Sequence, residues 1–392
     1  MPVSFPELTP EMRAHSDAVM NMIRDDMEKQ GGTISFDRFM ELALYAPGLG
    51  YYSAGAHKLG KGGDFVTAPE ISPLFAQCIA QQFAEILTTL PGGDILELGG
   101  GTGAFARDVL LELHEKNRLP EHYFILEISA DLRDRQQELL SHMLDAMLFA
   151  RVVWLEQLPE KFRGIIFANE VLDALPVRCF RVENRGVNVG VKERCVTFKD
   201  NRFRWELKTP HSKELNDAVL PLIQKHSLPD GYESEINLLM APWLKSLTEM
   251  LHEGVMLFFD YGYGQREYYH PEKNAGTLRC YFQHRCHADP FAFVGLQDLT
   301  AHVDFTRVVE SAEEVGLHVA GYTTQSAFLL NCGIADFMDA PPFSETYYRQ
   351  NQAIKLLMLP SEMGSLVKAV ALTKNWEAPL RGFASFDKRH EL

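Results

Sequence analysis

The stretch at residues 94–103, which reads DILELGGGTG, constrains this chain more than any other feature. It joins an apolar strand to a glycine-rich turn, and the acidic residue Glu97 stands just before the turn. The alternating glycines are Gly99, Gly101 and Gly103. Because glycine has no Cβ, the chain can turn sharply here from a strand into a helix, and a ligand can lie against bare backbone amides. The pattern therefore predicts a βα turn, with a helix from about Ala104, that binds a nucleoside cofactor.

Two classes of cofactor fit such a turn. Gly99-x-Gly101-x-x-Ala104 matches a loose dinucleotide fingerprint, in which a pyrophosphate sits at the helix N-terminus. The negative charge of Glu97 would repel a pyrophosphate, which is also negative. The same charge would attract the ammonium and sulfonium groups of S-adenosylmethionine (SAM). Glu127 ends the next apolar run, and a carboxylate there can accept both ribose hydroxyls of an adenosyl cofactor. The two acids favour SAM over a dinucleotide and over a glycine-rich turn without a ligand.

A second polar cluster follows the apolar run in residues 164–176, GIIFANEVLDALP. Asn169 and Glu170 stand where this strand should end, and Asp173 follows three residues later. The carboxyl ends of strands are where open α/β sheets bind ligands, and one helical turn would place Glu170 and Asp173 side by side. We expect these acceptors to be catalytic. The structural alternative is that Asp173 caps a helix and Glu170 is solvated.

Three segments carry a resemblance to a known family. They are residues 63–72 (GDFVTAPEIS), 169–176 (NEVLDALP) and 297–305 (QDLTAHVDF). On these motifs the chain, from about residue 15 to 375, resembles the MidA-type family of class I SAM-dependent methyltransferases, which includes the mitochondrial complex I assembly arginine methyltransferase. The resemblance implies methyl transfer to an arginine side chain of a partner protein, which in the eukaryotic member belongs to a complex I subunit. The start MPVSFP lacks an Arg-rich presequence, so we expect a bacterial, cytoplasmic member.

An arginine substrate makes specific demands on the site. A guanidinium is always protonated and offers no lone pair, so carboxylates must hold its N–H groups by charge-assisted hydrogen bonds. We expect the catalytic residues to be Asn169, Glu170 and Asp173, and the substrate-binding residues to be Glu70, Asp260 and Tyr261. We expect the cofactor to be bound by Glu97, Gly99, Gly101, Gly103, Glu127 and, at the adenine, Glu156. The paired-glutamate hairpin of better-known arginine methyltransferases is absent, so arginine specificity rests on the resemblance.

The order of the expected elements predicts an α/β fold with a Rossmann-like, seven-stranded class I methyltransferase core. Its strands are expected at 94–98, 123–127, 151–155, 164–169, 255–261, 318–325 and 366–372, with a helix at 304–316. Antiparallel hairpins are expected within 177–208, with strands at 177–182, 187–191, 195–199 and 202–206. We expect five regions. Residues 1–90 form a helical N-terminal region with a glycine-rich lid loop at 60–69, and residues 91–176 form the SAM-binding half of the core. Residues 177–250 form an inserted β-hairpin and helical region on the substrate side, residues 251–375 form the remaining core with a lid segment at 262–303, and residues 376–392 form a C-terminal tail.

Composition excludes several classes of function. The net charge of -15 argues against a nucleic-acid partner, because no basic excess can displace counterions, and it is compatible with a basic protein substrate or simply a solvated surface. No apolar stretch approaches the roughly 18–20 residues of a membrane span. The six cysteines show no CxxC pair, which indicates reduced thiols. His284, Cys286 and His287 match no zinc pattern, so we expect no metal.

Two alternatives stay open. A nicotinamide-dependent NAD(P) oxidoreductase would use the dinucleotide fingerprint, and cofactor titration separates it from a SAM enzyme. A non-catalytic SAM-binding assembly factor would grip a partner through the inserted hairpins, and a methylation assay separates it from an enzyme. The sequence is compatible with a homodimer, and it specifies neither the methylated protein nor the methylation product.

Overall fold

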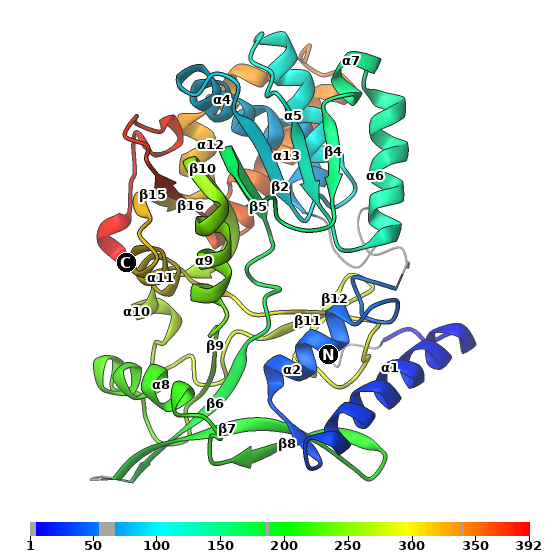
Figure 1. Cartoon of the computed structure of the whole chain (residues 1–392), viewed down its shortest axis with the longest axis vertical. Coiled ribbons are helices and arrows are strands. Elements are labelled where there is room, and N and C mark those ends of the chain that lie inside the picture. Colours follow the sequence, from blue (N-terminus) through cyan, green and yellow to red (C-terminus); the bar gives the residue numbers. More distant parts are fainter. Residues whose placement is uncertain (1–4, 55–66, 186–187, 339) are drawn as a thin grey trace.

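The computed structural model describes residues 5–54, 67–185, 188–338 and 340–392. Most of the expected lid loop at 60–69 therefore lies outside the described residues. Two sheets organise the fold (Figure 1). The central sheet and its helices fill the upper half of the view, and a second sheet lies below them, beside the N-terminal helices.

The central sheet has the strand order β15-β16-β10-β5-β2-β3-β4. Its strands are β2 (Asp94–Leu98), β3 (Tyr123–Leu126), β4 (Val152–Leu155), β5 (Phe162–Asn169), β10 (Leu251–Tyr263), β15 (His318–Thr324) and β16 (Val367–Lys374). Only β16 runs antiparallel to its neighbours. A short eighth strand, β14 (Val303–Asp304), continues the sheet beside the end of β10. The predicted seven-stranded core is confirmed. Successive strands are added on one side of β2 up to β4 and on its other side from β5 onward, and sheets of this kind bind ligands at the point where the strand order reverses.

Helices cover both faces of this sheet, because its strands are apolar on both sides. One face is covered by α4 (Pro73–Thr89), α5 (Ala104–Glu115), α6 (Ala130–Met143), α7 (Ala146–Phe149), α12 (Gln325–Asn331), α13 (Glu345–Met358) and α14 (Met363–Leu366). The other is covered by α9 (Met240–Met250) and α11 (Phe305–Glu314). Phe105 of α5 stacks on Phe167 of β5 with ring centroids 4.2 Å apart. This contact fixes the helix that follows the glycine turn against the strand that carries Asn169.

The second sheet holds β6 (Arg178–Arg185), β7 (Asn188–Lys199), β8 (Arg202–Lys208), β9 (Glu233–Ile236) and β1 (Thr33–Ile34). We expected strands at 187–191 and 195–199 to be separate, but β7 is one continuous strand. The polar residues between them do not break it because the buried carboxylate of Glu193 accepts a hydrogen bond from Arg178 Nε at 2.7 Å. Strand β1 comes from the N-terminal region, which is therefore not purely helical.

The N-terminal helices α1 (Pro10–Lys29) and α2 (Phe36–Tyr45) pack on the second sheet, and α8 (Lys213–His226) packs against it as well. The expected lid segment at 262–303 contains α10 (Gln265–Tyr268) and a small antiparallel sheet of β11 (Arg279–Phe282), β12 (Arg285–His287) and β13 (Asp298–Thr300). Leu299 of β13 lies in one apolar cluster with Phe39 of α2. This segment is thus a packed element that joins the N-terminal helices to the central sheet.

The segment expected as a C-terminal tail packs against the core. Phe383, in the short 3₁₀ helix Arg381–Phe383, is buried against Phe328, and Gln82 accepts the backbone N–H of Gly382 at 2.9 Å. The remaining short elements are α3 (Ala68–Ile71) and the 3₁₀ helices Ile334–Phe337 and Arg389–Glu391. Within the described ranges, no helix has both the length and the apolar character to cross a membrane.

Candidate functional site

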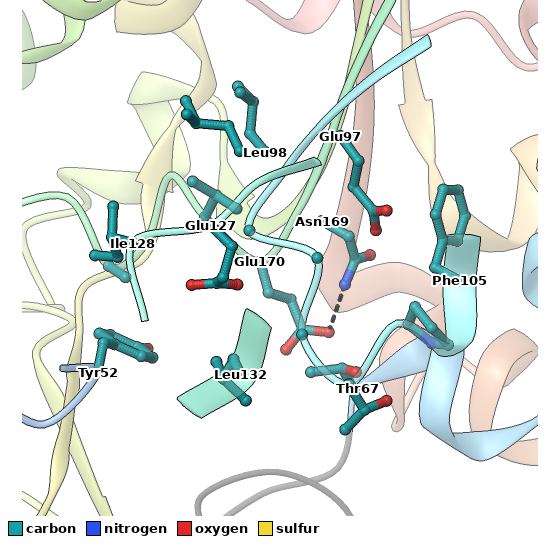
Figure 2. A pocket seen from close by; sticks show the side chains of 18 of the residues that line it. Tyr52, Thr67, Glu97, Leu98, Phe105, Glu127, Ile128, Leu132, Asn169 and Glu170 are labelled. Atoms are coloured by element: carbon teal, nitrogen blue, oxygen red, sulfur yellow. Dashed lines mark hydrogen bonds between the residues drawn. The ribbon is translucent and has the colours of Figure 1, made fainter. Parts of the chain in front are cut away.

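A cavity of about 310 Å³ lies at the carboxyl ends of β2, β3 and β5 (Figure 2). Its described lining includes four acids, which are Glu70, Glu97, Glu127 and Glu170, and it includes no arginine, lysine or histidine. A positive charge close to these acids stabilises their ionised forms, so the cavity favours a cationic ligand. The cavity therefore fits a ligand such as SAM, which carries both an ammonium and a sulfonium.

The glycine turn forms one wall of the cavity. Gly99, Gly101 and Gly103 all have left-handed backbone conformations, with φ of 69°, 53° and 89°. Gly99 and Gly101 line the cavity, whereas Gly103 is the N-cap of α5 and closes the turn. Between them, a Cβ on Gly100 would come within 2.8 Å of Ile125. At its glycines the turn therefore presents bare backbone to the cavity.

Glu97 and Glu127 lie where the sequence predicts them. Glu97 accepts a hydrogen bond from the Tyr123 hydroxyl at 2.9 Å, and burial raises the pKa of Glu97 to about 8. Glu127 accepts from the Ser129 backbone N–H at 2.9 Å and from Gln136 Nε2 at 3.2 Å, and burial raises its pKa as well. Both carboxylates are thus held in place, in surroundings that favour a bound positive charge or hydroxyl donors.

Gln136 of α6 was not expected from the sequence. Its Nε2 donates to Gly101 O at 2.9 Å as well as to Glu127, and its Oε1 accepts from Trp154 Nε1 at 2.9 Å. One buried amide therefore links the glycine turn, the acid after β3 and strand β4. A lone glutamine in a helix carries no local signal of this role.

Glu156, which was expected at the adenine, lies away from the cavity. Its side chain is 86% exposed, lies outside the cavity lining and pairs with Arg133 at 3.7 Å. The apolar part of the lining includes Leu126, Ile128, Leu158, Trp243 and Leu247. The last two belong to α9, more than 80 residues further along the chain, so the local sequence around β4 could not indicate them.

Asn169 and Glu170 both line the cavity at the end of β5. Glu170 has a left-handed backbone with φ of 53°, which is uncommon for a residue other than glycine, and its N–H donates to Phe259 O at 2.9 Å. Asn169 Nδ2 donates to Glu170 Oε1 at 3.1 Å, and the buried Oδ1 of Asn169 has no hydrogen-bond partner among the described residues. Burial, followed by the negative charge of Asp260, raises the pKa of Glu170 to about 8.

Asp173, Asp260 and Tyr261 lie outside the lining, contrary to the direct contacts expected from the sequence. Asp260 is fully buried, and its Oδ2 accepts the backbone N–H groups of three consecutive residues, Val171, Leu172 and Asp173, at 3.1, 2.7 and 3.3 Å. The carboxylate thus holds the turn that follows β5, where we expected a helical turn. Asp173 is buried behind this turn, and burial together with Asp260 raises its pKa well above the usual value.

Glu70 lines the cavity from the short helix α3. Its Oε1 accepts a hydrogen bond from the Thr102 hydroxyl in the glycine turn. The segment that begins at Thr67 is therefore attached to the glycine turn on the cofactor side of the cavity. From this position Glu70 can contact either the cofactor or a substrate.

Two tyrosines of the N-terminal region complete the lining. The Tyr45 hydroxyl donates to Ala174 O at 2.8 Å, and the Tyr52 hydroxyl donates to Asp298 Oδ1 at 2.8 Å. Their rings stack with centroids 5.5 Å apart. Sequence reasoning missed both tyrosines, because they reach the cavity from α2 and the turn after it, far along the chain from the glycine loop.

The fold and the cavity together define a class I SAM-dependent methyltransferase. The chain belongs to the family described as "Putative S-adenosyl-L-methionine-dependent methyltransferase", whose sequence model matches residues 78–323. A crystal structure of a protein from Burkholderia thailandensis with bound S-adenosyl-homocysteine is similar over 99% of this chain and 100% of that one, with 38% identity and a TM-score of 0.93.

Curated relatives are similar over most of their length. "Protein arginine methyltransferase NDUFAF7, mitochondrial" of Danio rerio is 28% identical, covering 91% of this chain and 90% of that protein. The Drosophila melanogaster homologue is 29% identical, covering 87% and 82%. The resemblance to the MidA-type family and the prediction of SAM as cofactor are confirmed, and a SAM enzyme takes the place of the oxidoreductase alternative.

Proposed function

We propose that this methyltransferase acts on the guanidinium of an arginine in a partner protein. The observation that carries the proposal is the half-buried carboxylate of Glu170, which lines the cavity beside Asn169, where the described lining includes no basic residue. A flat cation with several N–H donors satisfies such acceptors. The names of the curated relatives, which are protein arginine methyltransferases, support the same substrate.

The chemistry divides between the bound cofactor and this chain. Bound SAM supplies an activated methyl group, whose bond to sulfur breaks with its electron pair as a guanidinium nitrogen forms the new bond to carbon. The same nitrogen gives up one proton, and the Glu170 carboxylate accepts it. Burial raises the pKa of Glu170 to about 8, which makes its carboxylate a stronger base than a solvated glutamate. Alignment of the two reactants can supply about 7–11 kcal/mol of the barrier.

Each of the remaining residues has a distinct part in this proposal. Asn169 orients Glu170 through its amide and offers its Oδ1 to a second N–H of the substrate. Asp173 acts from behind the turn, where a bound cation favours its ionised form without touching it. Asp260 positions the turn through its three backbone hydrogen bonds. Glu70, beside Thr102, lines the same cavity and is a second carboxylate available for direct contact with the guanidinium.

Labelled SAM tests the substrate class directly. The purified enzyme is incubated with labelled SAM and a lysate from cells that lack it, and the modified residue is identified by mass spectrometry. We expect label on an arginine of one or a few proteins, and no label with E170Q protein that still binds SAM. Label on lysine, or on small molecules alone, would contradict an arginine substrate. A partner that co-purifies without methylation would favour the assembly-factor alternative. The bacterial, cytoplasmic setting and the homodimer stay predictions.

A further inference from the structure

Two tyrosines of the cavity lining, Tyr45 and Tyr52, already donate their hydroxyl protons to other groups of the protein. A phenol carries one proton and two oxygen lone pairs. Tyr52 donates its proton to the Asp298 carboxylate, and Tyr45 donates its proton to the Ala174 carbonyl, each at 2.8 Å. Carboxylates and carbonyls cannot return a proton in these bonds. The two hydroxyls can therefore only accept hydrogen bonds from a ligand in the cavity that they line.

The surrounding charges strengthen this acceptor character. Asp298, on β13, is 2% exposed and is held by the Leu299 backbone N–H at 2.9 Å. Its negative charge acts on Tyr45, Tyr52, Asp173 and Glu170. A hydroxyl that donates to a carboxylate is also a better acceptor, because hydrogen bonds in a chain polarise one another. Tyr52 is therefore the more strongly polarised of the two tyrosines.

These acceptors come from separate segments of the chain. Glu170 and Asn169 follow β5, whereas Tyr52 follows α2 and is anchored to β13 in the segment expected as a lid. Figure 2 places Tyr52 and Glu170 on the same cavity. A ligand that satisfies both must donate N–H groups in more than one direction. A planar guanidinium has five such donors in a fixed fork, whereas an ammonium has three at one point.

We propose that Tyr52, positioned by Asp298, determines specificity by accepting an N–H of the substrate guanidinium. The inference rests on the proposed arginine substrate and adds a residue from outside the methyltransferase core to its recognition. In it, Tyr52 contacts the substrate, and Asp298 is a positioning residue that acts through the Tyr52 hydroxyl. The site thereby selects arginine over neutral and single-centre donors.

Two synthetic probes test this without knowledge of the natural partner. Each is an adenosine with a 5′-thioalkyl chain, ending in a guanidine in one probe and in the neutral, similarly shaped urea in the other. The ratio of their dissociation constants isolates the charged donor from the cofactor contacts. We expect wild-type protein to prefer the guanidine by more than tenfold, and Tyr52→Phe and Asp298→Asn each to lower that preference by about tenfold, the size expected when a charged hydrogen bond is lost. Affinity for S-adenosylhomocysteine should stay within twofold.

The control is Tyr322→Phe, which removes the hydroxyl of a buried tyrosine in β15, away from the cavity lining. Its guanidine preference should equal that of wild type. A wild-type protein without preference would overturn the proposed arginine substrate itself. A wild-type preference that survives in Tyr52→Phe would overturn only the role of Tyr52. An equal loss of S-adenosylhomocysteine affinity in Tyr52→Phe would make Tyr52 a cofactor residue instead. If Asp298→Asn fails to fold, Tyr52→Phe decides alone.

Discussion

Replacing Glu127 by alanine tests the assignment of the ribose acceptor. The residue is 5% exposed, and its carboxylate accepts hydrogen bonds from Ser129 and Gln136. Hydrogen bonds to a charged group contribute about 1.5–3 kcal/mol, so the loss of the ribose contact should weaken SAM binding by about 10- to 150-fold. Stability should change little. Burial raises the pKa of Glu127, so its charge is disfavoured in the folded state, and the removal of that charge offsets the unpaired Ser129 and Gln136 donors.

Calorimetric titration with SAM and thermal unfolding without ligand measure the two effects separately. Glu156→Ala is the matched control, because it removes the same side chain from a position where the carboxylate is 86% exposed and lies outside the cavity lining. We expect its SAM affinity to stay within twofold of wild type. A loss below twofold in Glu127→Ala, or equal losses in the two variants, would refute the assignment of the ribose to the carboxylate after β3.

Three further predictions follow from the site. Glu170→Gln should lower turnover by at least about 100-fold, because a charged contact to the transition state is lost, while its SAM affinity stays within a few-fold of wild type. Asp173→Asn, behind the turn, should lower turnover less. Near-normal single-turnover rates in Glu170→Gln would contradict the role of Glu170 as the base. Gly101→Val should abolish SAM binding with circular dichroism intact, because φ of 53° disfavours a branched residue, and retained affinity in titration would contradict the cradle. Burial raises the pKa of Glu97 and of Glu170 to about 8, whereas the pKa of these groups in the unfolded chain is about 4.5. The ligand-free protein should therefore lose stability as the pH rises from about 4.5 to about 8, and SAM should stabilise it more at the upper end of this range. A Tm that does not depend on pH would contradict this prediction.

The sequence predicted the core and the acids at its strand ends because their signals are local. An apolar run of four to eight residues followed by glycine or an acid marks both the strand and the point at which it ends. In a parallel sheet those ends meet at one edge, so Glu97, Glu127, Asn169 and Glu170 could be placed in one site without knowledge of the remaining chain. The methyltransferase core therefore followed from short segments read separately.

The rest of the cavity depends on contacts between distant segments. Tyr52 reaches the site because α2 packs on the second sheet, and Asp298 meets it from a strand about 250 residues later. The polar motif after β5 also misled, because a helical turn is the local reading of its spacing. The buried Asp260 instead collects the three backbone N–H groups there and removes the need for helical hydrogen bonds.

The acidic residues around the turn after β5 lower the stability of the ligand-free protein. Desolvation, together with the nearby negative charges of Asp260 and Asp298, raises the pKa values of Glu170 and Asp173, and Glu170 also has a left-handed backbone conformation. Each feature costs free energy in the ligand-free protein. A bound cation reverses the electrostatic part of that cost, because it favours the ionised form of every nearby carboxylate. This cost at the end of β5 is consistent with the proposed guanidinium substrate, and substitutions that relieve it should raise stability while lowering turnover.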